Sequence, residues 1–346
     1  MRYQQLRCAM LTQFAQPGGN LAAYFVIGAP GGGKSALARD VAYTHLRNHG
    51  VEPNDTNVIE FNASLRDPVD IMGTPRNADG VTDWIPPREF YNISADVQGD
   101  KPCFLILEEL SDAPMAMQNP MCRVIYDRCA GQLRLAPNLY IIATGNRTSD
   151  KSGANRISTK LGNRVRMHEF NENLDDWCDW AAKNAVDPLI IQFLRWRPNF
   201  LSDFSPERYS NPTPRSWADV NRIPVNQTSD IFMAEVASCV SEGPAAEYVA
   251  FRKVADALKP FEEYIKKPKT IEIPSEVSAK YAVVGMLTSH VNPDNASQVA
   301  LFIKRLELDF QTMFWVDTMK RVPGMLNNPD MLEWIRTSGK SIVQNN

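Results

Sequence analysis

The sequence predicts an α/β fold in its first half, with helices covering a parallel sheet, and a mainly helical second half. Up to about residue 168, short apolar runs alternate with helical segments, which is typical of strands and helices in parallel α/β domains. Beyond that point strand-like runs nearly disappear. With 346 residues, 44% of them hydrophobic and 22% charged, the chain can form more than one folded unit.

Five short apolar runs are the strand candidates. They lie at 23–27, 57–62, 103–107 and 139–144, with a weaker candidate at 166–170. Continuous apolar runs of this length are typical of parallel strands that are buried on both faces. Residues 66–92 are rich in Pro, Gly and Asp, so we expect a loop or hairpin insertion there.

Helical periodicity marks the remaining segments. One helix is expected at 35–49, directly after a glycine-rich turn. In the second half, helices are expected at 174–185, 188–196, 216–222, 232–239 and 245–258, and, after a Pro- and Lys-rich interruption at 259–274, at 278–289 and 297–319. The last of these carries apolar residues at helical spacing from Val299 to Phe314, which predicts core packing, with a partner-binding face as the alternative.

Charge and composition argue against several classes of protein. The chain has 37 basic and 40 acidic residues, a net charge of −3, so no global positive field favours nucleic acid or an anionic membrane. The six cysteines form no CxxC pair and the four histidines no HExxH motif, which argues against a zinc site. With no signal-like start and no run of about 18 apolar residues, we expect a cytoplasmic protein without membrane spans.

Residues 28–35 read GAPGGGKS and fit the phosphate-loop pattern G-x-x-x-x-G-K-[ST]. Glycines let backbone N–H groups surround phosphates, the lysine places a positive charge at the β- and γ-phosphates, and the serine hydroxyl can ligate Mg²⁺. The motif follows an apolar strand and precedes a helix, as this chemistry requires. We therefore predict an ATP and Mg²⁺ site contacted by Gly28, Ala29, Pro30, Gly31, Gly32, Gly33, Lys34, Ser35 and Ala36.

Two acidic residues follow another predicted strand. Phe104 to Leu107 is apolar, and Glu108 and Glu109 come directly after it. Ligands of open α/β sheets bind at the carboxyl ends of strands, so these carboxylates are expected near the phosphate loop. Glu108 is the candidate that holds Mg²⁺ together with Ser35, and Glu109 the candidate that activates water. A solvated acidic loop is the alternative.

With these two motifs, known as Walker A and Walker B, residues 20–225 resemble the AAA+ ATPases, most of all the MoxR-like branch carried by bacteria and their viruses. Asn146, after the run at 140–145, is similar to the family's polar sensor of the attacking water or γ-phosphate. Arg164 is similar to the arginine finger that reaches a neighbouring subunit's nucleotide, with Arg166 and Arg156 as competing candidates. Arg215 resembles the second sensor, which opens a lid helix.

The resemblance also implies a domain arrangement and partners. Residues 1–170 would form the AAA+ nucleotide-binding domain, with the inserted loop at 66–92 facing a ring pore, 171–260 a helical lid, and 261–346 a helical C-terminal extension. The family likeness implies a homo-oligomeric ring, a hexamer, and a protein partner carrying a von Willebrand factor A domain.

The function predicted from the residues and the resemblance is a Mg·ATP-hydrolysing ring, a chaperone that remodels or assembles a protein partner. One departure concerns Glu108, because the family usually has Asp there, and a longer side chain could slow hydrolysis. An ATP-binding assembly with little turnover is therefore one alternative. A DNA-associated motor or loader is another, although Lys266, Lys267 and Lys269 form the one dense basic cluster of the sequence.

Overall fold

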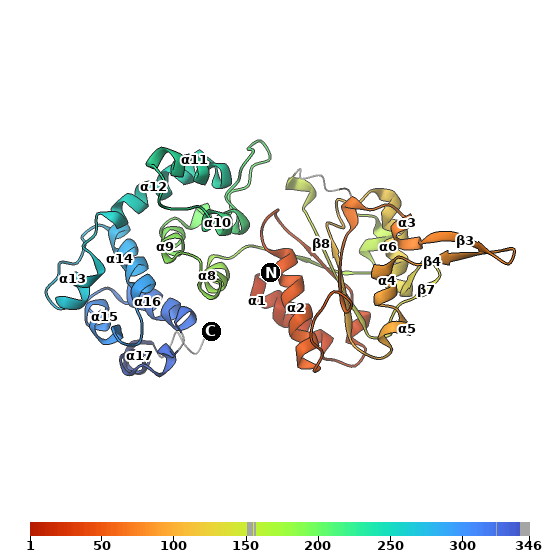
Figure 1. Ribbon diagram of the computed structural model, residues 1–346, viewed down its shortest axis with the longest axis horizontal. Coiled ribbons are helices and arrows are strands. Elements are labelled where there is room, and N and C mark those ends of the chain that lie inside the picture. The colour runs from red at the N-terminus through yellow and green to blue at the C-terminus, as the bar shows by residue number, and fades with distance from the viewer. Residues whose placement is uncertain (151–154, 156, 323, 340–346) are drawn as a thin grey trace. The chain divides into compact units, whose positions relative to one another are not determined.

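The computed structural model describes residues 1–150, 155, 157–322 and 324–339 (Figure 1). The chain divides into two compact units, Met1–Glu172 and Asn173–Asn346, which are described separately below. Within the described ranges, no helix is both long and apolar enough to cross a membrane.

The first unit is built on a parallel sheet, which confirms the predicted fold class. Among the described residues, its strand order is β2-β5-β8-β1-β9, and every neighbouring pair is parallel. The strands are β1 (Tyr24–Ile27), β2 (Val58–Asn62), β5 (Cys103–Glu108), β8 (Leu139–Gly145) and β9 (Arg166–Glu169). Each lies within two residues of its predicted bounds, because runs that are buried on both faces are apolar throughout.

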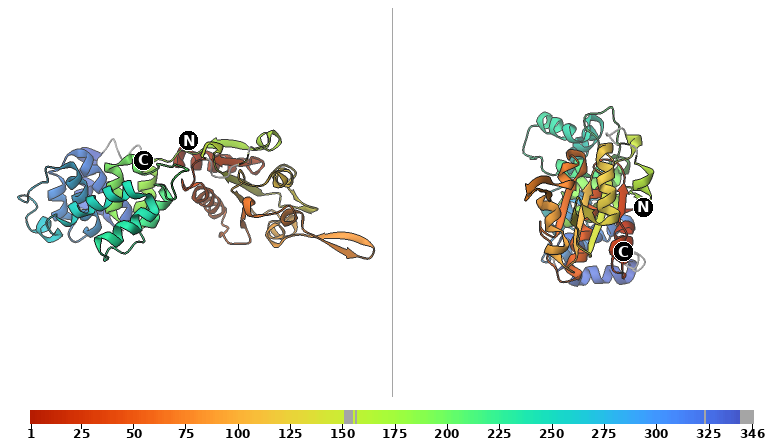
Figure 2. Two further views of the ribbon diagram at one scale, coloured as in Figure 1. Left: turned by 90° about the horizontal axis from the view of Figure 1, so that it is seen from above. Right: turned by 90° about the vertical axis from the view of Figure 1, so that its right-hand side faces the viewer.

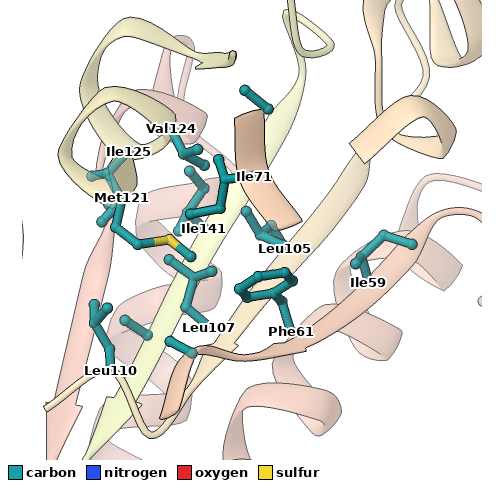
Figure 3. Close-up of a cluster of buried hydrophobic side chains, with 14 of the residues drawn as sticks. Ile59, Phe61, Ile71, Leu105, Leu107, Leu110, Met121, Val124, Ile125 and Ile141 are labelled. Atoms are coloured by element: carbon teal, nitrogen blue, oxygen red, sulfur yellow. The ribbon is translucent and has the colours of Figure 1, made fainter. Parts of the chain in front are cut away.

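Both faces of the sheet are covered by helices. Phe104 and Ile106 point to the face covered by α1 (Tyr3–Phe14) and α2 (Lys34–Asn48). The alternate residues, Leu105 and Leu107, belong to the cluster on the other face, which Figure 3 shows in close-up. The elements that contribute residues to that cluster include α3 (Val69–Met72), α4 (Arg88–Asn92), α6 (Met115–Asp127), α7 (Thr159–Gly162) and the 3-10 turn η2 (Ala63–Leu65). The unit also contains α5 (Ala95–Gln98) and the 3-10 turns η1 (Gly19–Leu21) and η3 (Thr148–Asp150).

Helix α1 was not predicted from the sequence. It buries Leu6, Met10 and Phe14, which are spaced four residues apart, while most of its other side chains are polar or exposed. A stripe of three residues is a weak periodic signal, and the helix is stabilised by packing on α2 and the sheet more than by its own sequence.

The insertion at 66–92 contains an antiparallel hairpin, one of the two forms expected for it. Strand β3 (Thr74–Ala78) pairs with β4 (Val81–Ile85), and the hairpin projects from the rest of the unit (Figure 1). Its exposed apolar side chains include Val81 and Ile85. A second small hairpin joins β6 (Cys129–Ala130) to β7 (Leu133–Arg134).

The second unit is helical in its described residues (Figure 2). One apolar cluster is formed mainly by α8 (Leu174–Lys183), α9 (Pro188–Trp196), α10 (Pro214–Val220), α11 (Ser229–Val240) and α12 (Glu242–Asp256). Another is formed mainly by α13 (Phe261–Lys266), α14 (Val277–His290), α15 (Ala296–Ile303), α16 (Leu308–Arg321) and α17 (Pro329–Trp334). The short turns are η4 (Pro198–Phe200), η5 (Met325–Asn327) and η6 (Ile335–Gly339).

The prediction of one long helix at 297–319 is wrong, because the chain turns between α15 and α16. The two halves pack on different partners: the Phe302 ring lies 4.9 Å from Tyr264, and the Phe310 ring 5.0 Å from Tyr281. A straight helix would present both rings to the same side. The predicted core role of the stripe is confirmed, since its residues from Val299 to Phe314 are buried or packed against the cluster.

A buried ion pair joins α16 to α9 within this unit. Arg195 contacts Asp317 through two hydrogen bonds, the shorter of 2.5 Å, and the Asp317 side chain is 3% exposed. Gln192 donates a further hydrogen bond to the same carboxylate. Residues of the predicted C-terminal extension are thus fixed to the first helices of the unit.

Candidate nucleotide-binding site

The segment between β1 and α2 has the backbone geometry of an anion cradle. Gly31 and Gly33 have φ angles of 72° and 105°, in the left-handed region that residues with a Cβ rarely adopt. Backbone of this kind turns successive N–H groups toward one side, and Gly33 caps the start of α2, where further N–H groups have no helical partner. The predicted phosphate loop can therefore surround an anion.

The side chain of Lys34 is folded back on this loop. Its Nζ donates to the carbonyl oxygens of Gly28 and Ala29 at 2.9 and 2.7 Å, and to Oδ1 of Asn146 at 3.1 Å. Lys34 is 9% exposed. These three acceptors are neutral oxygens, and phosphate oxygens would form stronger, charge-assisted hydrogen bonds with the same ammonium group.

Glu108 is the last residue of β5 and points to the α2 face of the sheet. Its Oε1 lies 3.6 Å from Nη2 of Arg39 and is buried without a hydrogen-bond partner. Ser35, the second residue of α2, is half-buried. Among the described residues no three His, Cys, Asp or Glu side chains cluster as a metal site. Mg²⁺ usually takes one or two protein oxygens plus phosphate oxygens, so this donor set fits it.

Glu109 has a strained backbone and a tethered side chain. Its φ of 52° lies in the left-handed region, which costs a non-glycine residue roughly 1 kcal/mol or more. Its Oε2 accepts hydrogen bonds from Nδ2 of Asn62 at 3.1 Å and from Oγ of Ser64 at 2.6 Å. Asn62 is the last residue of β2, and Ser64 comes shortly after it. In the sheet, β2 and β1 lie on opposite sides of β5, so in this structure the Glu109 carboxylate is held away from the phosphate loop.

Asn146 follows β8 and lies between Lys34 and an acid that was not predicted from the sequence. Its Nδ2 donates to Oδ2 of Asp112 at 2.9 Å, while its Oδ1 accepts from Lys34. Asp112 carried no sequence signal beyond its position three residues after Glu109.

Glu172 is a second carboxylate that the sequence did not identify. A Cβ built on Gly32 would lie 2.2 Å from its Oε1, so the carboxyl group packs directly on the phosphate loop. That oxygen is buried without a hydrogen-bond partner. Burial raises the pKa of Glu172, although Arg147 and Lys34 act to lower it. A negative charge here would oppose an anion in the loop.

Two of the predicted arginines, Arg164 and Arg166, lie at the end of the sheet opposite the phosphate loop. The Arg164 guanidinium stacks 4.8 Å from the Tyr126 ring, and Arg166 donates to Gln13 at 2.7 Å. Both line a cavity of about 310 Å³ at the amino ends of β1 and β9, opposite the phosphate loop of their own chain. Arg156 lies outside the described residues. Arg215 is exposed at the start of α10 in the second unit.

The start of α10 carries a capping box. Thr213 Oγ1 accepts a hydrogen bond from the backbone of Ser216 at 3.1 Å, and Ser216 Oγ accepts one from the backbone of Thr213. The cap accounts for the start of the helix at this point of the sequence.

No family model matches the chain, and no curated protein matches its sequence. Several solved structures are similar to the chain at low sequence identity. NtrX from Brucella abortus is 15% identical over 90% of this chain and 67% of its own, with a TM-score of 0.36. NtrX in complex with ADP covers 99% and 67% at 14% identity, with a TM-score of 0.34. A RuvB variant from Thermotoga maritima covers 77% and 75% at 14% identity, with a TM-score of 0.39.

Proposed function

We propose that this protein binds Mg·ATP in the phosphate loop and hydrolyses it. The observation that carries the proposal is the convergence of three separate segments on one place: Lys34 of the loop contacts Asn146 after β8, and Asn146 contacts the turn that follows the acidic end of β5. A glycine turn with a purely structural role would not need a buried lysine at its centre.

Each residue has a proposed role. The loop amides and Lys34 bind the triphosphate. The Ser35 hydroxyl and the Glu108 carboxylate are the protein oxygens that would hold Mg²⁺, which when bound neutralises charge on the phosphates. Glu109 orients and deprotonates the attacking water, once its carboxylate has released the hydrogen bonds from Asn62 and Ser64. The Asn146 amide forms hydrogen bonds at the γ-phosphate end of the site, as it does with Lys34 in the structure.

The assay that tests this proposal is phosphate release by the purified protein with ATP and Mg²⁺. We expect turnover in the wild type, loss of binding and turnover in Lys34→Ala, and binding without turnover in Glu109→Gln. Lys101→Ala, which removes an exposed lysine of the same unit, is the control and should behave as wild type. Equal rates of phosphate release in Lys34→Ala, Glu109→Gln and the wild type would refute the proposed ATPase activity.

The proposed assembly is a ring of identical subunits, a hexamer, in which Arg164 completes the site of the next subunit. Its position opposite the phosphate loop of its own chain supports action in trans. Arg215 would sense the γ-phosphate from the second unit, and the β3–β4 hairpin would contact the remodelled protein partner. A partner with a von Willebrand factor A domain and a cytoplasmic location belong to the same proposal.

Complementation tests the action in trans. Arg164→Ala and Glu109→Gln should each be inactive alone. When the two are mixed and allowed to assemble, some interfaces combine an intact Glu109 from one subunit with an intact Arg164 from its neighbour, so part of the activity should return. Absence of recovery, together with mixed assembly by size measurement, would place Arg164 outside the site.

A second candidate is an assembly that binds ATP and rarely hydrolyses it. The hydrogen bonds that hold Glu109 on Asn62 and Ser64 favour it, because a tethered base does not reach water at the phosphate loop. This candidate predicts ATP-dependent assembly with negligible phosphate release, which the same assays distinguish.

A further inference from the structure

Asp112 is a half-buried carboxylate beside the proposed site with no role in the mechanism above. It lies in the turn after β5, where its backbone N–H donates to the carbonyl oxygen of Glu109 at 2.9 Å. The same turn is fixed to β8, because the N–H of Leu110 donates to the carbonyl oxygen of Thr144 at 2.9 Å. The turn therefore has a defined position next to Asn146.

Asp112 and its neighbour Ser111 hold both the backbone and the side chain of Asn146. The Ser111 hydroxyl accepts from the N–H of Asn146 at 2.7 Å and donates to Oδ1 of Asp112 at 2.6 Å. The other carboxylate oxygen of Asp112 accepts from Nδ2 of Asn146 at 2.9 Å. The three residues form a closed ring of hydrogen bonds.

This ring decides which way the Asn146 amide faces. An amide can present either its oxygen or its NH₂ group to a given neighbour, and its environment selects the orientation. In the observed orientation the NH₂ group meets a carboxylate and the oxygen meets the ammonium group of Lys34, at 3.1 Å. The flipped amide would place oxygen against carboxylate and NH₂ against ammonium, which are two repulsive contacts.

We propose that Asp112 is a positioning residue that fixes the Asn146 amide with Oδ1 toward Lys34 and the phosphate loop. The inference rests on the ATPase proposed above. Asn146 then presents a hydrogen-bond acceptor to the nucleotide side, which suits Lys34 or a water molecule and not an unprotonated phosphate oxygen. An Asn held by a neutral partner would keep only the selection by Lys34, whose ammonium group also has to bind phosphate.

A reciprocal exchange of side chains tests the proposal. Asp112→Asn keeps the size but removes the contribution of the carboxylate to the bias, so we expect kcat for ATP to fall about 10-fold, the loss expected for one charge-assisted hydrogen bond, with KM within about 2-fold. Asn146→Asp places two carboxylates face to face, so its residual rate should rise as pH falls. The double variant Asp112→Asn with Asn146→Asp restores a donor opposite an acceptor and keeps an oxygen toward Lys34. It should recover kcat to within about 3-fold of wild type.

Asp127→Asn, which removes an exposed acid at the end of α6, is the matched control and should leave kcat unchanged. If the wild type hydrolyses ATP but Asp112→Asn has wild-type kcat, or the double variant is no better than the singles, the positioning role is refuted while the proposed function stands.

If the wild type does not hydrolyse ATP, a measurement that does not depend on turnover tests the positioning role. In protein labelled with ¹⁵N-asparagine, the Asn146 side-chain amide signal is identified by its absence in Asn146→Asp. We expect it to shift in Asp112→Asn and to stay in place in Asp127→Asn. An unmoved signal in Asp112→Asn would overturn the inference whether or not the protein is an ATPase.

Discussion

The Asn62 amide donates a hydrogen bond of 3.1 Å to Oε2 of Glu109, and Ser64 donates a second, of 2.6 Å, to the same oxygen. Asn62 ends β2, and Glu109 follows β5, the next strand of the sheet. The proposed base, Glu109, is thus held by the β2 side of the sheet, while β1 and the phosphate loop lie on the other side of β5.

Removing this tether should raise basal hydrolysis. Ser64→Ala deletes the shorter of the two hydrogen bonds, and a bond to a carboxylate contributes roughly 1.5–3 kcal/mol. We expect the basal phosphate-release rate of Ser64→Ala to rise several-fold. In the double variant Asn62→Ala with Ser64→Ala, which removes both hydrogen bonds, the rate should rise further. Ser149→Ala, in an exposed turn of the same unit, is the control. A lower rate in Ser64→Ala would mean that the tether holds Glu109 in its productive position.

Glu108 should determine the Mg²⁺ requirement. Glu108→Gln keeps the side-chain length and removes the charge, so we expect the Mg²⁺ concentration for half-maximal ATPase to rise by about 10-fold, the effect of losing roughly 1.4 kcal/mol of cation binding. Glu60→Gln is the control. It also removes a carboxylate partner of Arg39, whose Nε lies 2.5 Å from Glu60 Oε1, but Glu60 lies in the middle of β2. An equal Mg²⁺ shift in both variants would show that Glu108 acts through Arg39 alone.

Glu172 should weaken ATP binding when it is ionised. Glu172→Gln removes the negative charge that packs on Gly32, so we expect a several-fold lower Kd for ATP by calorimetry. Burial raises the pKa of Glu172, so its protonated fraction grows as pH falls from neutrality toward that raised value. The advantage of the variant over wild type should therefore shrink at lower pH. Glu169→Gln, whose acid pairs with Arg147 at 3.0 Å, is the control.

The ion pair between Arg195 and Asp317 should stabilise the second unit. Asp317→Asn leaves the Arg195 guanidinium buried without its anion, which costs about 3–5 kcal/mol of unfolding free energy. Asp219→Asn breaks the exposed pair with Arg222 and should cost at most about 1 kcal/mol. Urea unfolding followed by tryptophan fluorescence measures both. Equal effects would show that Asp317 contributes no more than a surface charge.

His45 should make the first unit sensitive to acid. Burial first, and then His49, lowers the pKa of His45 to about 4, and its Nε2 is buried without a hydrogen-bond partner. The unfolded chain, with a pKa near 6.5, binds the proton more readily, so stability is full above about pH 6.5 and falls by up to about 3 kcal/mol toward pH 4. Urea midpoints at pH 7 and 4.5 should converge in His45→Leu, and keep their wild-type difference in the exposed control His290→Leu.

Local sequence was enough to predict the sheet and the elements that carry the proposed site. A glycine-rich turn between an apolar run and a helix specifies its own backbone, since Gly33 at a φ of 105° is a conformation that few other residues adopt. Strands buried on both faces are apolar along their whole length, so their ends, and hence Glu108, could be located. These features depend on neighbours in the chain.

The contacts that surround the predicted residues depended on the tertiary structure. Asn62 and Glu109 are 47 positions apart, and only the strand order β2-β5-β8-β1-β9 places them together. Asp112 and Glu172 have no periodicity or motif of their own, and the turn between α15 and α16 follows from two aromatic partners on different helices. By itself the sequence determined the backbone of the phosphate loop and the ends of the strands. The packing of distant segments decided which side chains hold, orient or oppose the groups placed there, because such contacts leave no trace in local periodicity.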